Sequence, residues 1–540
     1  MSLKVAVGKT ALGAVRRCVA IAGHRLKMLL GKARAGAGAT SVGLVFIAVS
    51  AELGGCAVGP NYHAPQIPVP DAFITAGSPA KAGAGVDLSK WWEALGDREL
   101  NSLIERAIHA NPDIEIALTR LQEVRTQEAA HLGAALPTIS ASAAGGRGTG
   151  SDLSRAGAQP ALREADNKGN LAQIRQVAGV SASWELDLFG GYRRAIEAGR
   201  YDVAAATADR DVVLISVVAD VARNYVDIRG LQSRLAILRN NIAAAMQSRD
   251  FQRIRFERGL TNELDLQLAQ RELATLRAQL PVLTSQVSVL RGDLAVLLGE
   301  FPEKMAGELD KSGDLPKPPA TVPTGIPPDL LRRRPDVRAA ERQLAGATAR
   351  IGLATAALFP HLVLSGGVGA QSGGIGLQGS HIWAFGPSLY WPVLDFGQLD
   401  AQVDSADLQA HEKLIAYKKS IIAAVRDTDN AFAGFSAQEQ RLEALGEART
   451  ASERALNLAQ QRYERGLTDF LNVVDAEQQQ FSLEDQYTAA EQNAADAFIT
   501  LCQALGGGWE HYQQAPAIRK PLPAVIAGPR RLVMRDGSSQ

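Results

Sequence analysis

The chain carries a long internal duplication, and no other feature of the sequence restricts its possible folds as strongly. The segments FERGLTNELDLQLAQR (256–271) and YERGLTDFLNVVDAEQ (463–478) share a Glu-Arg-Gly-Leu-Thr core 207 positions apart. At the same spacing, WELDLFG (184–190) corresponds to WPVLDFG (391–397). Repeats of this length are much longer than solenoid units, so the sequence predicts two copies of one large half-unit.

Upstream of these segments the two copies align at a different spacing. Asn111-Pro112 aligns with Arg334-Pro335, and Leu136-Pro137 with Phe359-Pro360, at an offset of 223, so the first copy holds 16 additional residues before Trp184. Asn followed by Pro is also a helix start signal. The expected division is a leader at 1–55, an N-terminal linker at 56–95, a first repeat at 96–310, a second repeat at 311–508 and a partly disordered C-terminal tail at 509–540.

The composition favours long helices and argues against nucleic acid as a partner. Basic and acidic side chains number 57 each, so the net charge is zero, and aromatic residues make up 5% of the chain. No basic stripe runs along the sequence, as a nucleic-acid surface would require. Ala, Leu and charged residues dominate the long segments, which is typical of coiled coils.

The amino-terminal region has the features of an export signal. The apolar stretch TSVGLVFIAVSA (40–51) follows basic residues and is too short to span a bilayer as a helix. LGGC (53–56) comes next and resembles a bacterial lipobox, which would make Cys56 the lipidated first residue of the mature chain. Because Ala57 follows rather than Asp, the resemblance implies sorting to the outer membrane. A start at Met28 would give a leader of more ordinary length, and a free cysteine after a weak anchor is the alternative.

Each copy contains a pair of segments with strand-like alternation. In VAGVSASWELDLF (177–189) every second residue from Ala178 to Leu188 is apolar, and Ser, Glu and Asp stand between them. This pattern predicts a strand with one apolar and one polar face. Strands are expected at about 137–149, 174–187, 360–372 and 382–396.

Four such strands are long enough to cross an outer membrane but too few to close a barrel. An open sheet in lipid leaves backbone groups unpaired at several kcal/mol each, and even small spanning barrels need about eight strands. Strands that span the membrane would therefore have to be pooled from several chains. The alternation alone equally allows the edge of a soluble β-sandwich.

A very long helical stretch follows each strand pair, at about 190–257 and 397–464, and each would reach roughly 100 Å. In the helix that returns from the first stretch, apolar residues repeat at spacings of three and four, which predicts a coiled-coil seam. Its members are Leu273, Leu276, Leu280, Leu283, Val287, Leu290, Leu294 and Leu297. Pro281 lies within this run, and we expect it to bend the helix.

The repeated Arg-Gly-Leu-Thr segments read as the tips of helical hairpins. Gly259 and Gly466 are expected to end a helix in the left-handed conformation. Thr261 and Thr468 are expected to cap the helix that follows. A plain helix–helix turn accounts for this much without any function.

Together these motifs resemble the TolC-type outer membrane factor family, and in particular its lipidated OprM/NodT-like efflux ducts. The resemblance also includes GIPPDLLRRRPDVRAAE (325–341) and LCQALGGGWE (501–510). It implies a mainly α protein with a β-barrel portion, in which a trimer forms a twelve-stranded outer-membrane barrel continued by a periplasmic α-helical coiled-coil barrel. A mixed equatorial layer would be built from residues 300–330 and both chain ends.

For function, the resemblance implies the outer-membrane channel of a tripartite efflux system. Small molecules would leave the cell through the trimeric duct, docked to a periplasmic adaptor and to an inner-membrane, proton-driven pump. The adaptor would contact the hairpin tips, which comprise Arg258, Gly259, Leu260, Thr261, Arg465, Gly466, Leu467 and Thr468.

The resemblance also places a narrow aperture just inside the tips, formed by Leu471, Asp475, Asp265 and Asn472. Rings of carboxylates with a leucine constriction would repel anions and close by packing. Family members often carry an acid where Asn472 stands, so this ring is expected to be less charged. A solvated helix face is the alternative for Asp475.

No sequence motif points to catalysis. HExxH, GxSxG and paired-cysteine metal spacings do not occur, so no enzymatic activity, cofactor or metal is expected. Energy for transport would then come from the pump. The competing function is a lipid-anchored periplasmic coiled-coil scaffold without a pore.

Overall fold

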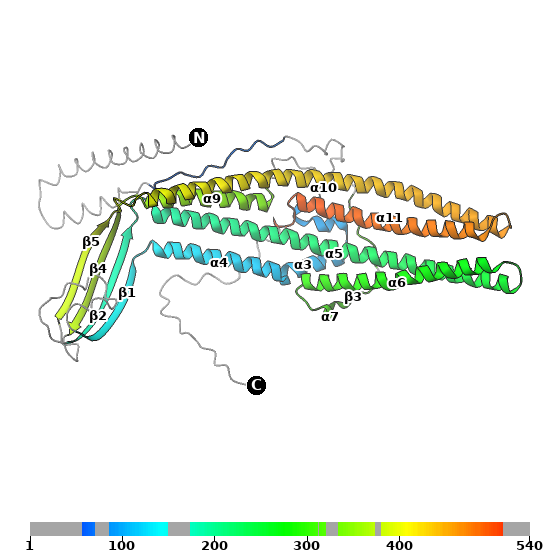
Figure 1. The fold of residues 1–540 in the computed structure, drawn as a ribbon, viewed down its shortest axis with the longest axis horizontal. Helices are drawn as coiled ribbons and strands as arrows, with labels where there is room; N and C mark the ends of the chain where they lie inside the picture. The colour runs from blue at the N-terminus through cyan, green and yellow to red at the C-terminus, as the bar shows by residue number, and fades with distance from the viewer. Residues whose placement is uncertain are drawn as a thin grey trace.

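The computed structural model describes residues 57–70, 86–148, 173–311, 313–319, 333–372 and 380–510. The expected leader, Cys56, the tail beyond residue 510 and part of the 325–341 motif lie outside these residues. The described chain is elongated, with a sheet at one end and long helices running away from it (Figure 1).

The sheet is antiparallel, with its described strands in the order β1-β2-β4-β5. Their bounds are Thr138–Gly148, Gln173–Leu186, His361–Ser372 and Ser380–Tyr390. The central pair joins the two repeats, with Trp184 opposite Leu364 and Val180 opposite Val368. Because directly opposed residues share a face, the apolar residues of the alternating pattern collect on one side of the sheet.

β5 is shorter than the expected 382–396 and ends at Tyr390. Pro392 has no amide hydrogen for a ladder. The indole of Trp391 instead donates to the carbonyl of Leu358, just before β4 (3.1 Å). β2 likewise stops at Leu186, so Leu188, the last apolar residue of the alternating pattern, lies past the end of the strand.

The apolar face of the sheet is bare. Trp383 is 74% exposed and Phe385 71%, and Val180 and Val368 are also exposed. The described strands include no second sheet that could cover these side chains, as a sandwich requires. A face of this kind suits contact with lipid rather than water.

The helices of the two copies correspond residue for residue. α5 (Gly191–Glu257) and α6 (Glu263–Leu297) have their counterparts in α10 (Gln398–Glu464) and α11 (Phe470–Ala504). Every boundary is shifted by 207, and the long helices match the expected 190–257 and 397–464. Shorter helices, α4 (Pro112–Ala134) and α9 (Pro335–Ala356), continue toward the sheet.

The apolar seam of α6 is confirmed. Leu273 and Leu276 are buried with Leu238 of α5, and Val287 is buried in a neighbouring cluster. The expected effect of Pro281 needs correction, because α6 continues through it as one helix. Among the described helices α6 is long and apolar enough for a membrane span by composition alone. Its seam nevertheless packs on α5, which marks it as a bundle helix.

In the first repeat, α4 begins directly against the end of α6. Asn111 accepts from the amides of Asp113 (2.8 Å) and Ile114 (3.2 Å), as the Asn-Pro start signal predicts. Its Nδ2 also donates to the carbonyl of Leu297 at the end of α6 (2.8 Å). The Asn111 side chain thus satisfies unpaired amides at the start of α4 and an unpaired carbonyl at the end of α6, and it joins the two helix ends.

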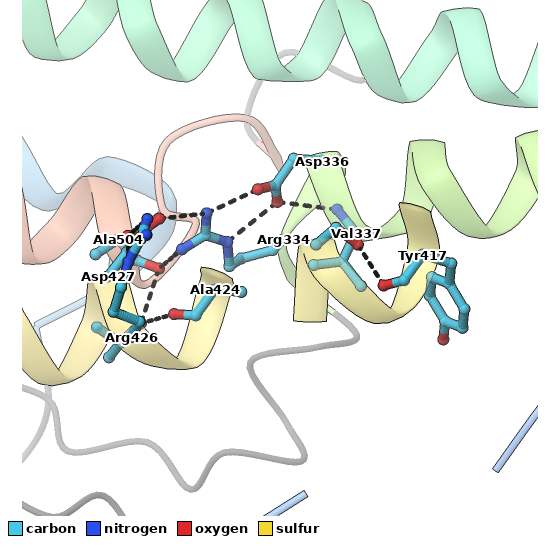
Figure 2. A network of polar contacts seen from close by, with 10 residues as sticks. Arg334, Asp336, Val337, Tyr417, Ala424, Arg426, Asp427 and Ala504 are labelled. Atoms are coloured by element: carbon cyan, nitrogen blue, oxygen red, sulfur yellow. Dashed lines mark hydrogen bonds and ion pairs between the residues drawn. The ribbon is translucent and has the colours of Figure 1, made fainter. Parts of the chain in front are cut away.

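The second repeat builds the same joint with different chemistry. Arg334, which corresponds to Asn111, donates to the carbonyl of Ala504 at the end of α11 (3.0 Å) and to Asp336 (2.7 Å) (Figure 2). A guanidinium has no acceptor, so it cannot cap α9. Asp336 instead accepts from the amide of Val337 (2.9 Å).

A mixed layer surrounds the middle of the helices. It contains the short helix η2 (Leu88–Leu95), α3 (Arg98–Ala110), α7 (Pro302–Met305) and β3 (Ala306–Leu309). Trp91, Tyr225 and Phe498 are buried at its centre. The layer fixes the two hairpins relative to one another at the level where both helix joints lie.

Candidate functional site

The two hairpin tips have the same backbone geometry. Gly259 has φ of 70° and Gly466 of 71°, so both occupy the left-handed region, as expected. Leu260 donates its amide to the carbonyl of Arg255 (2.8 Å), and Leu467 does the same to Arg462 (2.8 Å). These bonds pair the last carbonyls of α5 and α10 in a Schellman-type ending.

The tip surfaces combine positive charge with an apolar side chain. Arg258, Gly259 and Leu260 are exposed, and so are Arg465, Gly466 and Leu467, while the two threonines are half-buried. An exposed leucine beside an arginine at both tips offers a partner an apolar contact and a donor fork. The structure therefore brings all eight predicted tip residues to the end of the molecule farthest from the sheet (Figure 1).

The predicted caps of the returning helices are wrong by one residue. Asn262 and Asp469 are the capping residues, with ψ of 168° and 157°, because the turn needs one more extended residue before the helix begins. Thr261 instead donates its hydroxyl to Asp265. The Thr468 hydroxyl accepts from the side-chain Nδ2 of Asn472 (2.7 Å), so the same contact exists with donor and acceptor exchanged.

A buried polar contact holds the two hairpins together near their tips. Gln252 of α5 is fully buried, and its Nε2 donates to the hydroxyl of Tyr463 of α10 (3.0 Å). Arg255 stacks over the Tyr463 ring, 5.2 Å from its centroid. Tyr463 also packs on Phe470, with ring centroids 5.5 Å apart. The tips therefore form one packed unit.

The predicted aperture residues of the second repeat share an exposed face of α11. Leu471 and Asp475 are one helical turn apart and both exposed, whereas Val473 and Val474 between them are buried against the first hairpin. Asn472 is exposed beside them. The burial of the two valines leaves Leu471 and Asp475 free to face whatever lies beyond the bundle.

The predicted aperture residue of the first repeat, Asp265, lies in the first turn of α6. Asp265 corresponds to Asn472, and its carboxylate is engaged by Thr261. Leu264 corresponds to Leu471. Both leucines are exposed in the first turn of their helices. The repeat offset contains this information, so Leu264 could have been found from the sequence.

An acidic pair between α5 and α11 carries no recognisable sequence signal. Burial, reinforced by the nearby charge of Asp227, raises the pKa of Asp496 to about 7. Its Oδ1 has no hydrogen-bond partner among the described residues. Burial raises the pKa of Asp227 as well, while the hydrogen bond that it accepts from Gln492 favours its charged form.

We expect Asp496 to make the folded protein less stable as pH rises. Its folded pKa of about 7 lies above the ordinary 3.8, so the folded state binds this proton more tightly, and that contribution is lost as pH rises from about 4 through 7. Asp496→Asn should shrink the difference in melting temperature between pH 5 and pH 8, measured in detergent. Asp293→Asn, at an exposed position of α6, is the control. An unaltered pH difference in Asp496→Asn would contradict the expectation.

Known proteins of one kind resemble the chain over most of its length. The model of the outer membrane efflux protein family matches residues 103–300 and 326–507. Nodulation protein T of Rhizobium leguminosarum bv. trifolii is 31% identical, over 86% of this chain and 97% of that protein. The outer membrane protein OprJ of Pseudomonas aeruginosa is 30% identical, over 87% and 96%.

Solved structures agree in fold. The outer-membrane channel OprN superposes with a TM-score of 0.75 and 33% identity, covering 84% of this chain and 100% of that one. The open state of the MtrE outer membrane channel of Neisseria gonorrhoeae gives 0.69 and 27%, covering 84% and 99%. The chain belongs to the outer membrane efflux protein family, and it is the outer-membrane channel component of an efflux system, extending from that membrane into the periplasm.

Proposed function

We propose that three copies of the chain close one duct by repeating between copies the contact that joins the two repeats within a chain. Within the chain, β2 and α5 of the first repeat meet β4 and α9 of the second. The free edges are β5 with α10 on one side and β1 with α4 on the other. These are the repeat counterparts of the inner elements, so one edge is complementary to the opposite edge of another copy.

The edge helix α10 carries the side chains that such a contact needs. Leu408, Ile415 and Ile422 are exposed at seven-residue intervals, which makes one apolar stripe. Their counterparts on α5 are Tyr201, Ala208 and Ile215. Ala208 and Ile215 are buried within the chain, and α5 packs on both α9 and α4. The stripe on α10 would be buried in the same way by α4 of the next copy.

An aromatic contact at the junction of sheet and helices supports the same pairing. Phe189 stacks on Phe359 within the chain, with centroids 4.5 Å apart. Their repeat counterparts are Phe396, which is 92% exposed, and Leu136, which is 63% exposed. Two large apolar side chains left bare at opposite edges are explained if Phe396 meets Leu136 of the neighbouring copy.

The duplication also predicts the register between copies. Ser181 pairs with Gly367 in the inner contact, and their counterparts are Ser388 of β5 and Ala144 of β1. Both lie on the polar face of the sheet, so the register preserves the apolar and polar sides. Ser388→Cys with Ala144→Cys should therefore form disulfides between subunits and give a covalent trimer on non-reducing gels.

The matched control pairs Ser388→Cys with Ala143→Cys, which lies on the opposite face and should cross-link poorly. Equal cross-linking by the two pairs, or none by the first, would contradict the register.

A scaffold without a pore is the competing function. The purified, heat-modifiable trimer should conduct ions as single channels in a planar bilayer, which a scaffold would not do.

In this assembly the three sheets supply twelve strands, and the helices continue the duct into the periplasm. The hairpin tips dock a periplasmic adaptor and, through it, an inner-membrane, proton-driven pump. Leu471 and Asp475, with Asn472, Asp265 and Leu264, form the narrow aperture, and Cys56 carries the lipid anchor. The chain moves small molecules without chemical change, so it has no catalytic step. The complementarity of the two free edges is the observation that supports the proposal most directly.

A further inference from the structure

A buried arginine binds the first described residues of the chain where the sheet meets the helices. Arg194 lies in the first turn of α5 and is 3% exposed. Its Nε donates to the carbonyl of Val58 (3.0 Å), and its Nη2 donates to the carbonyl of Gly59 (3.3 Å) and the side chain of Asn61 (2.8 Å). Glu197 accepts from Nη1 (2.7 Å) and balances the charge. Two nitrogens of one guanidinium, Nε and Nη2, thus bind a single short segment, as in a peptide-binding site.

Close backbone packing fixes residues 57–59 in a narrow slot between Gly190 and Gly352. The amide of Val58 donates to the carbonyl of Phe189 just after β2 (3.1 Å). Gly59 has φ of 88° and lies against Gly352 of α9, where an added Cβ would stand 2.3 Å from the Gly352 Cα. No other residue fits at position 59, because both the backbone angle and the contact exclude a side chain.

We propose that Arg194 is the positioning residue for the membrane anchor. Ala57 lies against Gly190, where an added Cβ would be 2.6 Å from the Ala57 Cα. Cys56 directly precedes Ala57 in the chain, so Arg194 would hold the backbone next to the proposed acyl group at the junction of sheet and helices. This inference rests on the proposed lipidation of Cys56. The second repeat has Ala401 in place of Arg194, in keeping with a single amino terminus to hold.

The next residues of the segment, from Tyr62 to Val69, also pack against the long helices. Tyr62 donates to Glu341 of α9 (3.2 Å) and packs edge-on against Tyr201 of α5 (6.0 Å). Ile67 and Val69 pack against a buried cluster of α9 and α10. Figure 1 shows this segment running beside those helices. A force on the anchor is therefore transmitted to helices of both repeats.

Hydrogen exchange of the purified full-length trimer tests the proposal. Arg194→Ala should raise the exchange rate in residues 57–61 at least tenfold, because three charge-assisted bonds are lost. Gly59→Val leaves Arg194 in place but puts a side chain where only glycine fits against Gly352 of α9, so it should raise exchange in residues 57–61 as well. Arg194→Lys should fall between, since an ammonium cannot reach all the acceptors. Arg200→Ala, on the same helix with a 71% exposed side chain, is the control.

Core peptides of α5 should exchange as in the wild type in every variant. Unchanged exchange of residues 57–61 in Arg194→Ala, or an equal rise in Arg200→Ala, would overturn the proposal. Metabolic palmitate labelling separates it from the proposed lipidation. All Arg194 variants should still incorporate palmitate. A wild-type protein that incorporates none would contradict the proposed lipidation of Cys56, independently of the exchange result.

Discussion

Replacing Leu471 and Asp475 together with alanine should raise the single-channel conductance of the purified trimer several-fold. Both side chains are exposed on one face of α11, one turn apart, while the valines between them are buried. In a ring of three copies the leucines would narrow the path and the carboxylates would set its charge. Removing both widens the opening and weakens selection for cations, so the anion permeability should rise as well.

The control for this variant removes one leucine and one carboxylate at positions away from the predicted aperture. Leu458→Ala with Glu447→Ala alters an exposed leucine and an exposed acid on α10, and it should leave conductance unchanged. Leu264→Ala should add to the effect if the first repeat lines the same opening. Wild-type conductance in the Leu471/Asp475 variant would remove these residues from the aperture.

Much of the fold could be predicted from the sequence because the chain is duplicated. A shared offset forces both copies into one backbone, so hairpin ends, long helices and strand pairs could be placed from sequence words alone. The same offset makes the edge contact between copies a consequence of the inner one. Even Leu264 follows from it, once Leu471 is assigned.

What the sequence did not reveal are contacts whose chemistry differs between the copies. The offset of 223 aligns Asn111 with Arg334, but the sequence does not show that an amide and a guanidinium make equivalent helix joints there. The caps at Asn262 and Asp469 depend on one extended residue that the turn requires. Arg194 reads as an ordinary surface residue of a helix until the fold brings the amino-terminal segment onto it.

Gly466→Trp should abolish efflux by the assembled system while leaving the trimer intact. A Cβ at Gly466 would meet no atom within 4 Å, so the indole would project into solvent at the tip. The left-handed backbone costs the new residue about 1–2 kcal/mol, which a large trimer tolerates. A docked adaptor must approach this surface closely, and a tryptophan would hold it away. Loss of resistance, with normal heat-modifiable trimer and lost adaptor co-purification, is the expected result.

Two further substitutions separate docking from backbone strain at the tip. Gly96→Trp introduces the same residue at φ of 70° with no atom within 4 Å, but in the mixed layer, so it carries the same strain away from the tip and should keep efflux. Gly466→Asn places a small side chain that accepts the left-handed region, and it should retain most activity. If Gly466→Trp still supported efflux, the tip would not be the docking surface. If Gly96→Trp failed equally, strain rather than docking would explain the loss.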